Sequence, residues 1–184
     1  MARALAGRQI AFLLANEGVE QIELTDPWQA VEQDGGRAVL LAPESGFVQG
    51  FTGRDRAARF PVHLSVAEAS VDEFAGLVLP GGVVNADQLR LKPGAVALVR
   101  QFVDTGKPVA AICHAAWTLI EAGAVAGKTL TSWPSLRTDL ENAGATWVDE
   151  VVHVDTSAGW PLISSRNPDD LPEFCREANR AFAA

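Results

Sequence analysis

The chain carries a cysteine and a histidine side by side, Cys113 and His114, where the local pattern changes from strand to helix. Residues 109–112 form an unbroken apolar run, which is typical of a strand buried on both faces, and a helical pattern follows from Ala115. A thiol at such a junction lies at the carboxyl edge of a parallel sheet, and the N–H groups of the next helix favour its thiolate. The pattern predicts a nucleophilic cysteine on a sharp turn. The alternative is that Cys113 is an ordinary buried cysteine.

A thiolate needs a partner that takes its proton or donates a hydrogen bond to it. We expect His114 to reach at least the rim of the site, although adjacent side chains usually diverge. Glu23 is the better candidate for a hydrogen bond to the sulfur. The periodicity of a helix predicted from Glu20 to Gln33 places Glu20 and Glu23 on its inward face. The alternative is that both acids only occupy the first turn, where the helix dipole favours negative charge.

A second site signal is the pair Gly81 and Gly82, which follows the apolar run at 76–79 and Pro80. Consecutive glycines at the end of a buried strand let backbone N–H groups approach a ligand or a developing oxyanion. Taken alone the motif is weak, because glycines after a strand often form only a turn. If Cys113 lies at the same sheet edge, the N–H groups of Gly82 and His114 are predicted to form an oxyanion hole.

Composition and missing motifs exclude several other functions. The chain has 184 residues and a formal charge of −8, which argues against nucleic acid and anionic membranes as partners. No apolar stretch approaches the length of a membrane span. The scattered histidines predict no metal site, and no glycine-rich phosphate motif supports a nucleotide cofactor. The two cysteines do not form a disulfide framework, so we expect a cytoplasmic protein with reduced thiols, and Cys175 to be structural.

The elements that must position these residues alternate between strand and helix, which predicts a single α/β domain over residues 1–184 with a mostly parallel sheet and helices on both faces. We expect a proline at position 27 to kink its helix, and residues 45–66 to form an irregular hairpin. Predicted strands lie at 9–15, 38–42, 76–79, 109–112, 128–132, 146–148, 151–154 and 160–164. Predicted helices lie at 20–33, 93–104, 115–122, 136–142 and 169–182.

Five stretches, at residues 13–24, 77–82, 106–114, 131–144 and 163–172, together resemble the ThiJ/PfpI superfamily and specifically its PfpI branch. The superfamily is related to the class I glutamine amidotransferases. The resemblance covers nearly the whole chain in order, and Ala-Ile-Cys-His after Gly-Lys-Pro-Val is its most specific part. It implies a flavodoxin-like α/β sandwich with a nucleophile elbow at its cysteine.

The resemblance also implies roles for individual residues. Glu23 is similar to the family's acid beside the sulfur, His114 to the histidine of a Cys-His-acid triad, and Gly82 to its oxyanion-hole residue. The triad acid of PfpI-like proteins comes from a neighbouring subunit, and Asp87 is the candidate, which implies a homodimer or a higher homo-oligomer. Trp133 stands near the pocket where the family usually has a tyrosine. Its alternative role is that of a packed core tryptophan.

The activity implied by the resemblance is that of a cysteine-dependent hydrolase of the intracellular peptidase or stress-response type. Its substrate would be a peptide or a small carbonyl compound. A narrow elbow pocket admits a small aldehyde more easily than a folded chain. A glyoxalase or deglycase acting on methylglyoxal or early glycation adducts therefore remains an alternative. A redox-sensing stress protein oxidised at Cys113 without turnover, and a structural or binding protein with an inert cysteine, are further alternatives.

Overall fold

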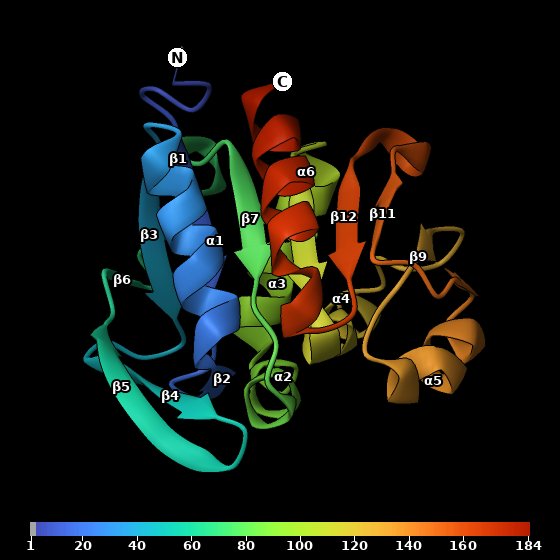
Figure 1. Cartoon of the computed structure of the whole chain (residues 1–184), viewed down its shortest axis with the longest axis horizontal. Helices are drawn as coiled ribbons and strands as arrows, with labels where there is room; N and C mark the ends of the chain where they lie inside the picture. The colour runs from blue at the N-terminus through green and yellow to red at the C-terminus, as the bar shows by residue number, and fades with distance from the viewer. Residues whose placement is uncertain (1–2) are drawn as a thin grey trace.

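A seven-stranded sheet forms the centre of the computed structural model, which describes residues 3–184 (Figure 1). All neighbouring strands pair in parallel except β11 and β12. The inner strands β7 and β8 are buried at every residue, as expected for a sheet covered on both faces. In spatial order the strands are β11 (Val152–Asp155), β12 (Leu162–Ser165), β8 (Val109–Ile112), β7 (Gly76–Leu79), β1 (Gln9–Leu13), β3 (Arg37–Ala42) and β6 (Leu64–Ser65).

Helices cover both faces of this sheet. The helices α1 (Gln21–Gln33) and α6 (Leu171–Ala183) lie side by side on one face, with α3 (Pro93–Asp104) and α4 (Ala116–Glu121) on the other (Figure 1). Alternate strand residues enter two separate cores: Phe12 packs with the α1 and α6 side, and Leu13 with the α3 and α4 side. The predicted flavodoxin-like sandwich is therefore confirmed.

A second, three-stranded sheet lies at the carboxyl edge of the central one (Figure 1). It consists of β2 (Glu17–Glu20) and the antiparallel hairpin of β4 (Phe47–Thr52) and β5 (Asp55–Pro61). The expected hairpin within 45–66 is thus present. The helix predicted from Glu20 begins one residue later, because the segment before it pairs with β4 as a strand.

Helix α1 runs without interruption through Pro27 to Gln33, and the kink expected at this proline stays a prediction. A proline removes one intrahelical hydrogen bond, but burial of Leu24, Pro27 and Val31 against the sheet offsets that loss. The remaining elements are α2 (Val83–Leu89), α5 (Arg137–Asn142), β9 (Thr129–Leu130) and β10 (Thr146–Trp147). No helix within residues 3–184 has the length and apolar character needed to cross a membrane.

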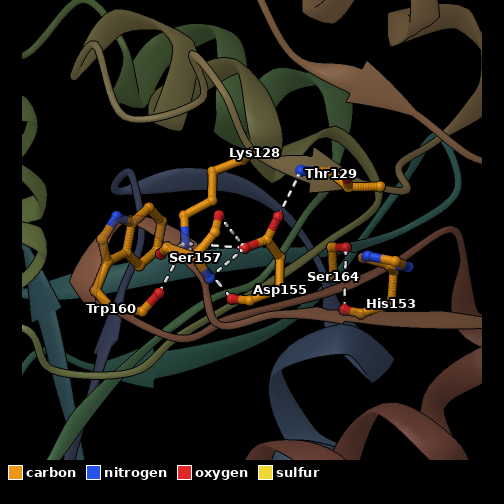
Figure 2. Close-up of polar contacts among 7 residues, drawn as sticks. All are labelled: Lys128, Thr129, His153, Asp155, Ser157, Trp160 and Ser164. Atoms are coloured by element: carbon orange, nitrogen blue, oxygen red, sulfur yellow. Dashed lines mark hydrogen bonds and ion pairs between the residues drawn. The ribbon is translucent and has the colours of Figure 1, made fainter.

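A buried ion pair joins the β9 end of the molecule to the sheet (Figure 2). Lys128 precedes β9 and is 1% exposed, and its Nζ lies 3.2 Å from Oδ1 of Asp155, the last residue of β11. Nζ also donates hydrogen bonds to the carbonyl oxygens of Ser157, at 2.5 Å, and Trp160, at 2.7 Å. The loop between β11 and β12 is therefore held around a single buried cation.

Candidate active site

Cys113 occupies the turn between β8 and α4 in a left-handed backbone conformation, with φ of +62°. A residue other than glycine adopts this conformation only when its surroundings impose it, and such strain is typical of functional turns. The side chain is buried, at 6% exposure, and the carbonyl oxygen accepts a hydrogen bond from the Trp133 N–H at 3.1 Å. The structure thus places the cysteine on the predicted nucleophile elbow.

Glu23 projects from the first turn of α1 toward this elbow and is fully buried. Its Oε2 accepts a hydrogen bond from the Gly81 N–H at 2.9 Å. Its Oε1 has no hydrogen-bond partner of regular geometry among residues 3–184. Burial raises the pKa of Glu23 from 4.5 to about 8, although contacts with the Cys113 thiol and the Gly81 N–H lower it. The carboxyl group therefore keeps its proton at neutral pH and faces the sulfur as a donor.

The thiol and the carboxyl group form a coupled pair. Burial raises the pKa of the Cys113 thiol, and an ionised Glu23 would raise it further, both by its charge and by accepting a hydrogen bond from the thiol. The N–H groups of Gly82 and His114 lower this pKa. Because Glu23 is neutral near pH 7, the repulsion between two negative charges is absent there. The protonated Glu23 carboxyl group and the N–H groups of Gly82 and His114 then surround the sulfur as donors. Hydrogen bonds from these donors stabilise the thiolate and so offset part of the cost of burying it.

His114 contacts the sulfur directly, since its Nδ1 lies 3.1 Å from Sγ. This is closer than the rim position expected for a side chain adjacent in sequence, and the positive φ of Cys113 provides the sharp turn. Its ring stacks on Trp133, with centroids 5.6 Å apart. Burial lowers the pKa of His114, so the neutral imidazole is available to accept the thiol proton. Trp133 is 39% exposed and lines the pocket, which excludes a core position.

The two glycines after β7 are required by close packing. A Cβ at Gly81 would lie 2.4 Å from Oε2 of Glu23, and one at Gly82 would lie 2.3 Å from the Gly18 carbonyl oxygen. Gly82 also has φ of +89°. Close packing therefore fixes Gly81 against Glu23 and Cys113, and Gly82 against the segment that precedes α1, while the oxyanion hole itself stays a prediction.

Asn85, which sequence reasoning missed, fastens this loop. Its buried side-chain amide donates hydrogen bonds to the carbonyl oxygens of Pro80, at 3.0 Å, and Gly81, at 2.9 Å, and accepts one from the Ala15 N–H at 2.7 Å. An asparagine three residues after a double glycine carries little signal by itself, because most such residues are exposed turn positions. Its role depends on strand β1 lying beside it.

These groups open into a pocket of about 390 Å³. The second sheet supplies Phe51 and Gly53, which the sequence did not indicate as site residues. Glu20 lines the pocket as predicted, and its Oε2 accepts a hydrogen bond from the Gly53 N–H at 3.0 Å. The full lining comprises Gly18, Glu20, Glu23, Phe51, Gly53, Gly82, Val83, Val84, Cys113, His114, Trp133 and Pro168.

Comparison with known proteins agrees with this geometry. Residues 8–181 match the model of the DJ-1/PfpI family. The chain belongs to that family. It is 39% identical to Deglycase PfpI of Pyrococcus furiosus over 169 residues, which are 92% of this chain and 96% of the relative. It is 36% identical to General stress protein 18 of Bacillus subtilis, over 94% of this chain and 96% of that protein.

A solved structure shows the same fold. A two-domain protein of Anabaena variabilis, with DJ-1/ThiJ/PfpI-like and ferritin-like domains, superposes with a TM-score of 0.85 and 33% sequence identity. The match covers 93% of this chain and 47% of that longer protein. The elbow, the flanking acid and the double-glycine loop thus belong to a DJ-1/PfpI fold.

Asp87 and Cys175, which the sequence analysis also considered, lie outside the pocket. Asp87 is on α2, exposed, and pairs with Arg90 at 2.9 Å, so within one chain it does not line the cysteine site. Its action across a subunit interface stays a prediction. Cys175 on α6 is partly buried against the core, which agrees with a structural role. Within residues 3–184, no three His, Cys, Asp or Glu side chains form a metal-binding group.

Proposed function

We propose that this protein is a cysteine-dependent hydrolase of small carbonyl compounds or early glycation adducts, of the deglycase or glyoxalase type. The observation that carries the proposal is the contact of Cys113 with both Glu23 and His114 at the base of a pocket of about 390 Å³. A pocket of that volume fits a small aldehyde or one modified side chain. Relatives named deglycase support the same chemistry.

The geometry supports a sequence of steps that needs no oxidant or reductant. His114 Nδ1 takes the thiol proton, and the sulfur adds to the aldehyde carbon of a 2-oxoaldehyde, giving a hemithioacetal. We expect the N–H groups of Gly82 and His114 to stabilise the developing oxyanion. Glu23 gives its proton to this oxyanion and, now a carboxylate, takes the carbon-bound proton and delivers it to the neighbouring carbon. The hydroxyl proton of the first carbon passes to the oxygen of the second, which yields a 2-hydroxy thioester. Water then cleaves the thioester, so that methylglyoxal and water become lactate and a proton.

Glu23 suits proton transfer because its pKa of about 8 lies close to neutral pH. A group with this pKa both accepts and returns a proton at working pH. In a glycation adduct the same sulfur displaces the amine, which leaves as the repaired side chain. Peptide hydrolysis by this site, which the resemblance also implied, stays a prediction.

The first experiment measures the pH dependence of Cys113 alkylation and the turnover of methylglyoxal, a glycated amine and a fluorogenic peptide. Cys113→Ser is expected to lower carbonyl turnover by about a thousandfold or more, while Cys175→Ser as the matched control retains it. Glu23→Ala is expected to raise the apparent pKa of Cys113 alkylation, because a donor to the sulfur is lost.

Two outcomes would contradict the proposal. Carbonyl turnover that persists in Cys113→Ser would remove the nucleophile. A lower alkylation pKa in Glu23→Ala would show that Glu23 acts as a repelling carboxylate rather than a donor. Turnover of the peptide alone would favour the peptidase instead.

A redox role is the second candidate, favoured by the buried Oε1 of Glu23, which has no partner of regular geometry among residues 3–184. Two equivalents of peroxide would convert Cys113 to a sulfinate, to which the Glu23 O–H could donate. Mass spectrometry after low peroxide is expected to show oxidation at Cys113 before Cys175. Oxidation in a protein that shows no turnover would favour this role.

We further propose that the protein forms homodimers or higher homo-oligomers in which Asp87 reaches a partner's site. Sedimentation tests the assembly, and Asp87→Asn tests the residue. A monomer with full activity would remove Asp87 from the catalytic group.

A further inference from the structure

The lining of the cysteine pocket contains three titratable side chains besides Cys113, namely Glu20, Glu23 and His114. Its lining includes no lysine or arginine. Burial keeps the Glu23 carboxyl protonated near neutral pH, and the lowered pKa of His114 keeps the imidazole neutral. The Glu20 carboxylate is close enough that its charge contributes to the raised pKa of Glu23. No lysine or arginine of the lining therefore offsets the charge that Glu20 places at the pocket.

Glu20 is held where β2 ends and α1 begins. Its Oε2 accepts the Gly53 N–H, which ties the carboxylate to the turn between β4 and β5. A carboxylate has four acceptor positions, so this single bond leaves capacity for a cationic donor. The helix N-terminus beside it favours a fixed negative charge at this place. The carboxylate is thus anchored, partly exposed and part of the pocket wall.

The opposite walls are aromatic and apolar. Phe51 and Trp133 line the pocket, together with Val83 and Val84. Aromatic faces attract cations, and planar guanidinium groups stack on them. At the base, the fully buried Glu23 carboxyl also lines the pocket, and its Oε1 has no partner of regular geometry among the described residues.

We propose that Glu20 makes this pocket select positively charged carbonyl adducts, such as those of a guanidinium or an amine, over anionic 2-oxo acids. The inference rests on the proposed carbonyl chemistry for its biological meaning. Its physical content is narrower: a cation near Cys113 is stabilised by Glu20, and an anion is repelled.

The test uses reaction of Cys113 with two thiol reagents of similar size and opposite charge, and it needs no turnover. They are the trimethylammonioethyl and sulfonatoethyl methanethiosulfonates, and the protein carries Cys175→Ser so that Cys113 is the only thiol. Wild-type Glu20 is expected to favour the cationic reagent. Glu20→Gln, which keeps an acceptor for the Gly53 N–H, is expected to lower the cation-to-anion rate ratio by about fivefold or more at low salt.

Control variants distinguish the effect of the Glu20 charge from the effect of its hydrogen bond to the β4–β5 hairpin. Glu44→Gln removes the same charge from an exposed side chain outside the pocket and is expected to leave the ratio unchanged. Glu20→Ala removes both the charge and the acceptor. If the ratio falls only in Glu20→Ala, the hairpin position matters rather than the charge, and the inference is overturned.

An unchanged ratio in Glu20→Gln also overturns it, as does a Cys113 that neither reagent reaches. Turnover data then separate this inference from the proposed function. If the wild type turns over carbonyl compounds but Cys113 reacts equally with both reagents, only this inference is overturned. Charge-selective labelling without any turnover sinks only the proposed function.

Discussion

Two buried titratable pairs, Lys128–Asp155 and Glu23–Cys113, differ in how completely their hydrogen bonds are satisfied. Asp155 accepts from the Thr129 N–H and from Ser157, while Nζ of Lys128 faces three carbonyl oxygens and lies 4.2 Å from the Trp160 ring centroid (Figure 2). The cysteine pair instead opens into a cavity and leaves a carboxyl oxygen without a partner of regular geometry among residues 3–184.

The difference separates structure from chemistry. Burial acts to raise the pKa of Asp155, but hydrogen bonds from Ser157 and Thr129 and the contact with Lys128 outweigh it and hold that pKa well below its usual range. The acid is thus committed to its charged form. Burial of Glu23 is only partly compensated, by the Cys113 thiol and the Gly81 N–H, so its pKa rises to about 8. A satisfied pair holds a loop, and an incompletely satisfied pair retains the freedom to move a proton.

The largest expected effect comes from breaking the satisfied pair. Lys128→Met leaves Asp155 buried without its cation and is expected to lower the free energy of unfolding by about 3–5 kcal/mol. Urea denaturation measures this, and specific activity per folded molecule should stay near wild type. Arg137→Met, which removes an exposed ion pair with Glu141, is the control and should cost less than about 1 kcal/mol. A small loss in Lys128→Met would show that the pair is not structural.

The pH dependence of stability should have opposite signs at the two pairs. The unfolded Glu23 releases its proton near 4.5 and the folded one near 8. Wild type should therefore lose stability relative to Glu23→Gln as pH rises through this window, by up to about 1.4 kcal/mol per pH unit. Asp155 has a lowered folded pKa, so its contribution is present above its ordinary 3.8 and is lost on acidification.

Chemical denaturation of wild type, Glu23→Gln and Asp155→Asn measures how the free energy of unfolding changes with pH at both pairs. The range from about pH 3 to about pH 9 spans the ordinary pKa values of the two acids. Parallel curves for wild type and Glu23→Gln would mean that Glu23 ionises normally in the folded protein. The claimed difference between the two pairs would then be wrong for Glu23–Cys113.

The smallest expected effect concerns the aromatic wall that adjoins the reactive pair. Trp133→Ala removes the stack on His114 and is expected to lower kcat/KM for a carbonyl substrate by about two- to tenfold, the equivalent of about 0.5–1.5 kcal/mol. Trp133→Phe keeps a stacking ring and should stay within about twofold of wild type. Equal losses in both variants would point to the indole N–H rather than stacking.

Much of the site was accessible from sequence because its signals are local. The apolar run before Cys113 and the helix after it predict the elbow, and the glycines at 81 and 82 predict the loop beside it. Helical periodicity predicts that Glu23 lies on the inward face of its helix. These inferences need only neighbouring residues, since the side-chain period follows directly from the backbone geometry.

Residues brought in by distant pairing were missed. The pairing of β2 with β4 makes a strand of residues between the strand predicted at 9–15 and the helix predicted from Glu20, and it brings Phe51 and Gly53 to the pocket. Asn85 and the Lys128–Asp155 pair likewise act through strands far away in sequence. Pro27 remained helical because burial against the sheet outweighs a local preference.

The sequence by itself determined most of the alternation of strands and helices, the sharp turn that carries Cys113, and the family. Only the tertiary structure decided which acid is protonated and which is charged. Glu23 and Asp155 are both carboxylic acids whose type says nothing about their ionisation. Their pKa values diverge because one is buried with a single N–H donor and a thiol, and the other with a cation and several donors. That environment exists only once distant segments have packed together.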